Sequence, residues 1–247
     1  MMTKLLYLDE TYLFDGSGTV QSLGRDERGG YLILDRTIFY PQGGGQPADK
    51  GHLRIGEDVV PVTFVGFQDG DVRHYVLDMY WKEAYTGETA FLSVDRLYRL
   101  DNARLHTGGH LVSHVLEAIN GNLIPIKGYH FANGAYVEFV NEQNVDAASL
   151  IQDANARLSN DVGMSHDVSA SASDFDTISR LRPHLAPFIP KDKPSRIVAI
   201  GDYLALPCGG THVANLAQLG SIRITKAKKQ KANVRVSYEI GDPATFS

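Results

Sequence analysis

The spacing of apolar residues changes abruptly near Asp95, and this change limits the folds that the chain can adopt. Before Asp95, apolar residues lie in short segments separated by glycines and polar turns, which is typical of β-strands. The predicted strands are residues 4–8, 20–23, 31–35, 52–65, 73–76 and 89–94. Their even spacing predicts a small β-barrel-like domain over residues 1–95.

After Asp95 the apolar residues recur at intervals of three and four, which predicts helices. A first helix is expected from an N-cap at Asp101 or Asn102, and a second over residues 144–160. Strands are expected at residues 196–200, 221–225 and 234–240, whereas residues 163–176 give no clear pattern. We therefore predict an α+β fold in which residues 96–247 form a second, α+β domain with an antiparallel sheet.

Charge and cysteine content exclude several classes of protein. The 24 Lys and Arg residues are outnumbered by 29 Asp and Glu, so the net charge of −5 excludes a globally basic surface. A single cysteine cannot form an internal disulfide, and Asp9 and Glu10 follow the first residues too closely for a signal peptide. No apolar run reaches the roughly 18 residues that a membrane span needs. We expect a cytoplasmic protein without a membrane role.

Three histidines, His106, His110 and His114, lie four positions apart in the first predicted helix. Residues at i and i+4 project from the same helical face, so either adjacent pair could bind one metal ion. The spacing does not decide between the pairs, although the apolar neighbours of His114 favour a buried position for it. Two glycines, Gly108 and Gly109, each cost a helix roughly 1 kcal/mol relative to alanine, which suggests close packing or a ligand there.

A second motif, Cys208-Gly-Gly-Thr-His212, places the only thiol four positions before another histidine. Pro207 and the two glycines predict a loop at this point. A thiolate combined with imidazoles is a ligand set that favours Zn²⁺. The alternative is that the histidines are ordinary buried side chains and that Cys208 is a small buried apolar residue.

The glycine run at residues 43–45 predicts a loop, within the segment FYPQGGGQP at residues 39–47. Gln46 and Pro47 follow the glycines, where a phosphate-binding loop has Lys and Ser or Thr. We therefore expect no use of ATP, and no nucleotide cofactor. A chain of 247 residues is also too short to combine an aminoacylation domain, a tRNA-recognition module and an editing domain.

The HTGGH motif at residues 106–110, followed by CGGTH at residues 208–212, resembles the paired signature of alanyl-tRNA synthetase editing domains and of the freestanding AlaX family. The similarity extends through residues 2–15, 196–202 (RIVAIGD) and 219–224 (LGSIRI). Residues 37–51 resemble the glycine-rich motif of the medium-length AlaX proteins. The resemblance thus covers nearly the whole chain.

The resemblance implies a threonyl/alanyl-tRNA synthetase type of editing domain behind the barrel. It implies a zinc-dependent aminoacyl-tRNA deacylase that acts in translation fidelity on tRNA(Ala) mischarged with serine, and with glycine as a second substrate. The family's zinc ligands correspond to His106, His110, Cys208 and His212.

Selection of serine over alanine needs a group that hydrogen-bonds the serine hydroxyl, because a site built for a hydroxyl rejects the analogue that lacks it. Thr37 is the first candidate, followed by Gln46 and Thr107. Thr37 could equally be a strand-end residue chosen for its β propensity, and Gln46 a loop residue that faces water.

Local charge points to the RNA partner. Six basic and two acidic residues lie between Gly220 and Ser247, although the chain as a whole is acidic. Phosphate binding requires a local basic patch of this kind, whereas the alternative is a solvated turn between two strands. The candidate tRNA-binding residues are Arg99, Arg104, Lys226, Lys228, Lys229 and Lys231.

Two other functions fit the same residues. The four ligands could close around a structural zinc ion in a non-enzymatic RNA-binding module. Alternatively, Cys208 could be the nucleophile of a cysteine hydrolase with His212 as its base, which would leave His106 and His110 without a role.

Overall fold

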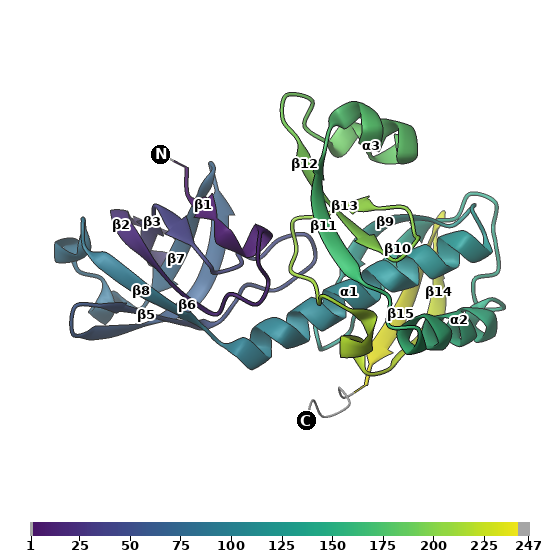
Figure 1. The fold of residues 1–247 in the computed structure, drawn as a ribbon, viewed down its shortest axis with the longest axis horizontal. Helices are drawn as coiled ribbons and strands as arrows, with labels where there is room; N and C mark the ends of the chain where they lie inside the picture. The colour runs from purple at the N-terminus through teal and green to yellow at the C-terminus, as the bar shows by residue number, and fades with distance from the viewer. Residues whose placement is uncertain (1, 242–247) are drawn as a thin grey trace. The chain divides into compact units, whose positions relative to one another are not determined.

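The computed structural model describes residues 2–241, and the chain divides into two compact units, residues 1–102 and 103–247 (Figure 1). Each unit has a hydrophobic core of its own. The predicted domain boundary between residues 95 and 96 lies just before this division.

The first unit is a closed β-barrel in which every neighbouring pair of strands is antiparallel. In barrel order its strands are β2 (Asp15–Asp26), β3 (Gly29–Leu34), β7 (Asp71–Val76), β6 (Asp58–Gln68), β5 (Gly51–Ile55) and β8 (Thr89–Val94). Alternate side chains such as Leu32, Leu34 and Leu53 point inward and are fully buried. The single strand predicted over residues 52–65 is wrong, because a turn at Gly56 (φ +58°) divides it into β5 and β6.

Short elements complete the first unit. Strand β1 (Lys4–Leu5) pairs in parallel with β4 (Arg36–Thr37), and three 3₁₀ turns, η1 (Leu6–Leu8), η2 (Asp78–Tyr80) and η3 (Glu83–Tyr85), lie in the connections. The predicted glycine-rich loop follows β4. It is held by hydrogen bonds from the Tyr40 N–H to Asp49 Oδ2 (2.6 Å) and from the Tyr40 hydroxyl to the Gly43 carbonyl (2.9 Å).

The second unit is built on a four-stranded antiparallel sheet and a long helix, α1 (Arg96–Ile119), which begins in the first unit. The strand order is β14 (Ile222–Gln230), β15 (Asn233–Ile240), β10 (Tyr136–Val140) and β9 (Ile124–Tyr129). Leu111, Val115 and Leu116 of α1 join Val236 and Phe139 of the sheet in one buried core. Helix α2 (Ile151–Gly163) packs on β14, where the Asn155 side chain bonds both backbone groups of Ile224.

A smaller antiparallel sheet carries the cysteine motif. Its order is β11 (Val168–Ser173), β12 (Ser195–Ile200) and β13 (Leu206–Pro207), so Cys208 follows directly on the last strand. Helix α3 (Phe175–Leu181) and the 3₁₀ turns η4 (Pro183–Phe188) and η5 (Leu216–Leu219) lie in the connections.

The predicted fold class is confirmed, with a small barrel followed by an α+β unit with antiparallel sheets. The predicted helix bounds are wrong in two places. Helix α1 begins at Arg96, because Asp95 caps it by accepting the Tyr98 N–H (3.1 Å). Helix α2 begins at Ile151, since the residues before it form tight turns in which Asn141 binds Val145. None of the helices within residues 2–241 is long and apolar enough to cross a membrane.

Candidate metal centre

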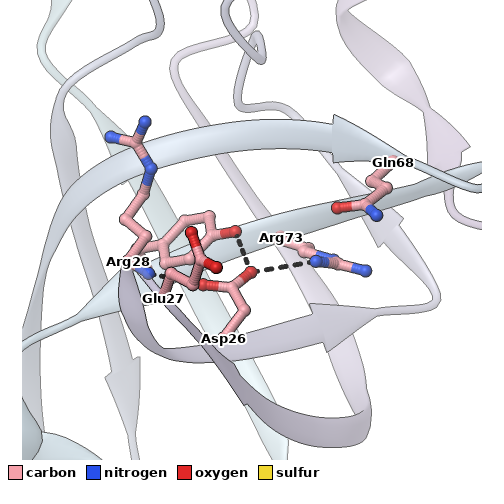
Figure 2. A pocket seen from close by; sticks show the side chains of 6 residues that line it. Asp26, Glu27, Arg28, Gln68 and Arg73 are labelled. Carbon is pink, nitrogen blue, oxygen red and sulfur yellow. Dashed lines mark hydrogen bonds and ion pairs between the residues drawn. The ribbon is translucent and has the colours of Figure 1, made fainter.

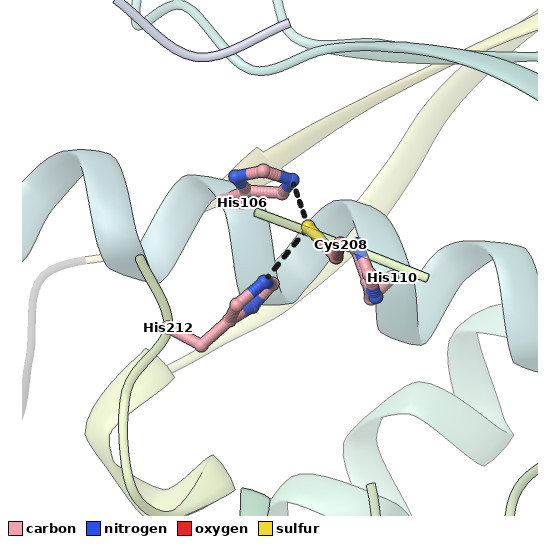
Figure 3. A group of neighbouring side chains, drawn as sticks. All are labelled: His106, His110, Cys208 and His212. Atoms are coloured by element: carbon pink, nitrogen blue, oxygen red, sulfur yellow. Dashed lines mark hydrogen bonds between the residues drawn. The ribbon is translucent and has the colours of Figure 1, made fainter. Parts of the chain in front are cut away.

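Helix α1 and the loop after β13 bring four side chains together in the second unit: His106, His110, Cys208 and His212 (Figure 3). One ligand atom from each lies within 4.8 Å of the other three. The Cys208 Sγ lies 3.4 Å from His106 Nε2 and 3.3 Å from His212 Nε2. We call these four residues the His/Cys cluster.

The loop that carries Cys208 is fixed by hydrogen bonds from several directions. The Arg196 guanidinium on β12 donates to the carbonyls of Cys208 (2.8 Å) and Gly210 (3.0 Å). The Gly210 N–H donates to Cys208 Sγ (3.3 Å). A backbone donor of this kind favours the thiolate form of a cysteine.

Thr107 lies within α1 and is fully buried behind His212. Its hydroxyl is 3.1 Å from His212 Nδ1 and also accepts the Val213 N–H. The contact turns the other ring nitrogen of His212, Nε2, toward Cys208. Thr107 therefore orients one member of the cluster, a contact that the sequence could not show.

Burial keeps the histidines of the His/Cys cluster neutral. It lowers the pKa of His110 to about 4 and the pKa values of His106 and His212 well below 6.5. Burial also raises the pKa of the Cys208 thiol. A neutral imidazole is the form that binds a metal, whereas the thiol needs a cation beside it to lose its proton at neutral pH.

The donor set fits a metal ion. Three neutral imidazoles and one thiol converge, and the Nδ1 of His110 is buried without a hydrogen-bond partner within residues 2–241. Imidazole nitrogens and a cysteine sulfur within 4.8 Å of one another are a donor set typical of transition-metal sites. The site can therefore hold a metal ion.

His130 is a neighbour of the cluster that the sequence did not reveal. Its ring stacks on His106, with centroids 4.4 Å apart and planes 23° apart. The Tyr238 hydroxyl donates to the Leu105 carbonyl (2.7 Å), so His130 Nδ1 must donate to the Tyr238 oxygen (2.7 Å). No other histidine lies at ligand spacing from His130 in the chain, so only the fold brings it to His106.

The two helix glycines make this packing possible. A Cβ on Gly109 would lie 2.2 Å from His130 Cε1, and one on Gly108 would lie 3.1 Å from an Ile222 methyl group. His114, one turn beyond His110, is buried and stacked on Tyr203 with centroids 5.1 Å apart. Its position outside the His/Cys cluster agrees with the buried environment expected for it.

The other predicted selectivity residues, Thr37 and Gln46, are fully buried in the first unit. The Thr37 hydroxyl lies 2.8 Å from His74 Nε2 and accepts the Phe39 N–H (3.0 Å). Gln46 closes the glycine-rich loop through backbone bonds with Gly43 in both directions. The role of either residue toward a serine hydroxyl stays a prediction.

Two of the candidate RNA-binding residues have structural roles. The fully buried Arg99 forms an ion pair with Asp49 and also donates to the carbonyls of Thr11 and Ile38. Arg104 donates to the carbonyls of Gln218, Leu219 and Gly241. Neither guanidinium is available to a phosphate without losing these bonds, so we leave both out of the proposed RNA surface.

The predicted lysines lie at the surface but on two sides of the sheet. Lys226 and Lys228 pair with Ser237 and Arg235, whereas Lys229 pairs with the buried Val234. Paired residues share a sheet face, so Lys229 lies opposite Lys228. It donates to Asn144 Oδ1 (2.7 Å). We call the side that carries Lys226 and Lys228 the outer face.

Lys231 lies in the turn between β14 and β15, and the acidic Asp242 lies outside the described residues. The turn that was the alternative to a phosphate-binding patch is limited to two residues, because β14 extends to Gln230 and β15 starts at Asn233. Most of the basic run is thus strand.

A separate pocket of about 640 Å³ lies on the barrel (Figure 2). Its central carboxylate, Asp26, accepts bonds from the Tyr75 hydroxyl (2.6 Å), the Arg73 guanidinium (2.9 Å) and the Arg28 N–H (2.9 Å). None of the predicted site residues lines this pocket.

The family match found by comparison with known proteins includes the cysteine motif. Residues 195–236 match the family described as threonyl and alanyl tRNA synthetase second additional domain. The alanyl-tRNA editing protein AlaX-L of Pyrococcus horikoshii is 28% identical over 97% of the residues of this chain. The AlaX-M protein of Methanosarcina acetivorans is 28% identical over 98% of the chain.

The chain is thus similar over nearly its whole length to proteins named alanyl-tRNA editing proteins. The resemblance expected from the two motifs is thereby confirmed. The alanine–tRNA ligase of Haloquadratum walsbyi is also similar, at 27% identity over 98% of the chain. The chain spans all of the AlaX-M protein, 58% of AlaX-L and 26% of the ligase.

Proposed function

We propose that this protein hydrolyses the ester bond of tRNA(Ala) that carries the wrong amino acid, chiefly serine and secondarily glycine. The observation that carries the proposal is the His/Cys cluster, formed by two motifs 102 positions apart. Its support is the similarity, over nearly the whole chain, to proteins named alanyl-tRNA editing proteins.

Zinc is the metal that we propose for the His/Cys cluster. Three imidazole nitrogens and one thiolate form a ligand set that zinc prefers over the hard cations Mg²⁺ and Ca²⁺. When bound, zinc supplies a positive charge that can polarise an ester carbonyl or fix the substrate's polar groups.

Other residues around the His/Cys cluster orient its side chains and its loop. Thr107 sets the ring of His212, and Tyr238 holds His130 against His106. Arg196 fixes two carbonyls within the cysteine motif, those of Cys208 and Gly210. Hydrogen bonds from neighbouring residues to metal ligands fix the orientation of those ligands before substrate arrives. An aminoacyl ester is already activated, so positioning and charge are sufficient to accelerate water addition.

Two features of the cluster bear on the alternatives, one for and one against. Four protein ligands would fill a tetrahedral site, as in a structural zinc module, and this favours the non-enzymatic alternative. For a cysteine hydrolase, Cys208 lies within reach of His212 (3.3 Å), but burial raises the pKa of its thiol. A nucleophilic cysteine needs the opposite shift.

The test is deacylation of seryl-, glycyl- and alanyl-tRNA(Ala) measured side by side without ATP. We expect hydrolysis of the seryl ester to exceed that of the alanyl ester by a wide margin. Absence of hydrolysis by metal-loaded protein that still binds tRNA would support the non-enzymatic module. Equal hydrolysis of the seryl and alanyl esters would contradict the editing proposal.

A Cys208→Asp variant separates the metal role from the nucleophile role. Aspartate can replace the thiolate as a zinc ligand but not as an attacking sulfur. Retained metal together with residual deacylation would exclude the cysteine hydrolase. Retained metal with complete loss of activity would favour it.

A further inference from the structure

The outer face of the four-stranded sheet carries a column of stacked rings. Phe131 and Tyr129 have centroids 4.4 Å apart, and Tyr129 and Tyr136 have centroids 5.2 Å apart, with both pairs of planes within 15° of parallel. The Arg235 guanidinium lies 4.0 Å from the centroid of Tyr136. The column therefore runs across β9, β10 and β15 and ends in a cation.

The rings lie on the side of the sheet away from the core. Tyr136 alternates along β10 with Val137 and Phe139, which are buried in the core. Its paired residues, Tyr129 on β9 and Ser237 on β15, share its face. All three rings of the column are only partly buried. Such rings do not serve the core, which fills the opposite face.

Positive charge surrounds the column. Arg223, Lys226, Lys228, Arg235 and Lys127 belong to the outer face by strand pairing, and Glu138 and Glu239 are its carboxylates. Glu239 pairs with Arg223 (3.0 Å), and Glu138 accepts from the Asn233 side chain (3.0 Å). Lys127, Lys226 and Lys228 form no ion pair within residues 2–241 and are exposed, so the face keeps an excess of free positive charge.

We propose that the outer face binds a single-stranded RNA segment. The phosphates would lie at Lys127, Lys226 and Lys228, and an unpaired base would extend the column at Phe131. Within residues 2–241, Tyr129 is the one ring that stacks on Phe131, and no cation lies over the Phe131 ring. Aromatic rings combined with basic side chains are the means by which proteins bind unpaired bases, whereas duplex RNA offers no free base faces. The inference rests on the proposed function only in taking RNA as the partner.

The experiment measures binding of a short unstructured RNA oligonucleotide and of an RNA duplex of equal charge by fluorescence anisotropy. We expect the single strand to bind more tightly. Phe131→Leu should weaken it about tenfold, because one stacked base contributes on that order. Phe91→Leu is the matched control, since Phe91 is an exposed barrel residue with Arg54 4.4 Å from its centroid. It should leave the affinity unchanged.

Adjacent lysines give a second matched pair. Lys228→Ala should lower the slope of log affinity against log salt by about 0.7, the value for one phosphate contact on a single strand. Lys229→Ala, on the other side of the same strand, should leave that slope unchanged. Equal effects of the two substitutions, or tighter binding of the duplex, would overturn the proposal.

Crosslinking locates the RNA independently of affinity. An oligonucleotide that contains 4-thiouridine should crosslink to peptides within residues 124–140, and crosslinks found only elsewhere would contradict the outer face as the site. Because none of these measurements uses an aminoacyl ester, the two proposals can fail separately. Deacylation without oligonucleotide binding would refute the RNA face alone, and binding without deacylation would refute the editing function alone.

Discussion

Histidines one turn apart on helix α1 have different surroundings and different expected roles. His110 belongs to the cluster, whereas His114, one turn later, stacks on Tyr203. We expect His110→Ala to lower bound zinc from one ion per chain to a small fraction, because each lost ligand weakens the site severely. His114→Ala should keep the metal and lose stability instead.

Elemental analysis of purified protein and thermal unfolding of both variants check this prediction. Loss of metal from both variants to the same extent would show that the metal site is not the one formed by the four residues.

Thr37 has two bonds inside the barrel that a valine cannot make. Thr37→Val leaves His74 Nε2 and the Phe39 N–H without their partner, in a fully buried place. The free energy of unfolding should fall by about 1–3 kcal/mol, and Thr37→Ser should recover most of it. The ratio of seryl to alanyl hydrolysis in the same two variants tests the predicted role in selection. An unchanged ratio in Thr37→Val would place recognition of the hydroxyl elsewhere.

His74 should make the stability of the barrel depend on pH. Burial lowers its pKa to about 4, below the unfolded value near 6.5, so between these values the unfolded chain binds the proton more tightly. The contribution of neutral His74 to the free energy of unfolding is therefore complete above about pH 6.5 and decreases as the pH falls toward 4. Between about pH 7.5 and 5 the loss is about 2 kcal/mol for one histidine with this shift. Urea unfolding at both pH values gives the difference in free energy of unfolding between wild type and His74→Gln. This difference should be smaller at the lower pH.

At the scale of elements, helix α1 depends on having no side chain at Gly109. A Cβ there would lie 2.2 Å from His130 Cε1, so Gly109→Ala must displace His130 or the helix. We expect a loss of stability and weaker metal binding. Gly163, the last residue of α2, has no atom within 4 Å of such a Cβ. Gly163→Ala should therefore be neutral or stabilising. Equal melting temperatures for the two variants would contradict the close packing.

The sequence predicted elements well where apolar residues repeat with a clear period, as in β15 and in α1 beyond its first residues. It missed β9 and β10, because Pro125 and Gly128 interrupt the alternation in β9 and a single sequence does not show that β10 completes a sheet. Motif spacing left open which two of the three helix histidines join Cys208 and His212, and the four residues of the His/Cys cluster were named from the family resemblance.

Spacing cannot tell which basic residues are buried or which face they share. Arg99 looks like any other helix arginine until the fold places Asp49 beside it, fifty positions away. Lys228 and Lys229 are equivalent in sequence, and only the pairing with β15 separates them. His130 is likewise brought to the cluster by tertiary packing alone.

At the scale of the whole molecule, the two units have separate cores, and the single tryptophan reports on one of them. Trp81 lies in the first unit, where its Nε1 donates to the Gly24 carbonyl (3.2 Å). Chelation of zinc should lower the unfolding temperature seen by far-UV circular dichroism, because a ligand present at a thousand times its Kd stabilises by about 4 kcal/mol. The transition followed by Trp81 fluorescence should stay in place. A parallel shift of both signals would show that the units unfold together.

The separation of the two ligand motifs also sets an order of events during synthesis. His106 leaves the ribosome 102 residues before Cys208, an interval of roughly 5 to 20 seconds at ordinary rates of translation. Within that time the first unit and α1 are complete, while the histidines of the helix still lack their thiol. The barrel can thus fold on a nascent chain whose His/Cys cluster is still incomplete, and capture of the proposed metal ion would then be a late step in the maturation of the protein.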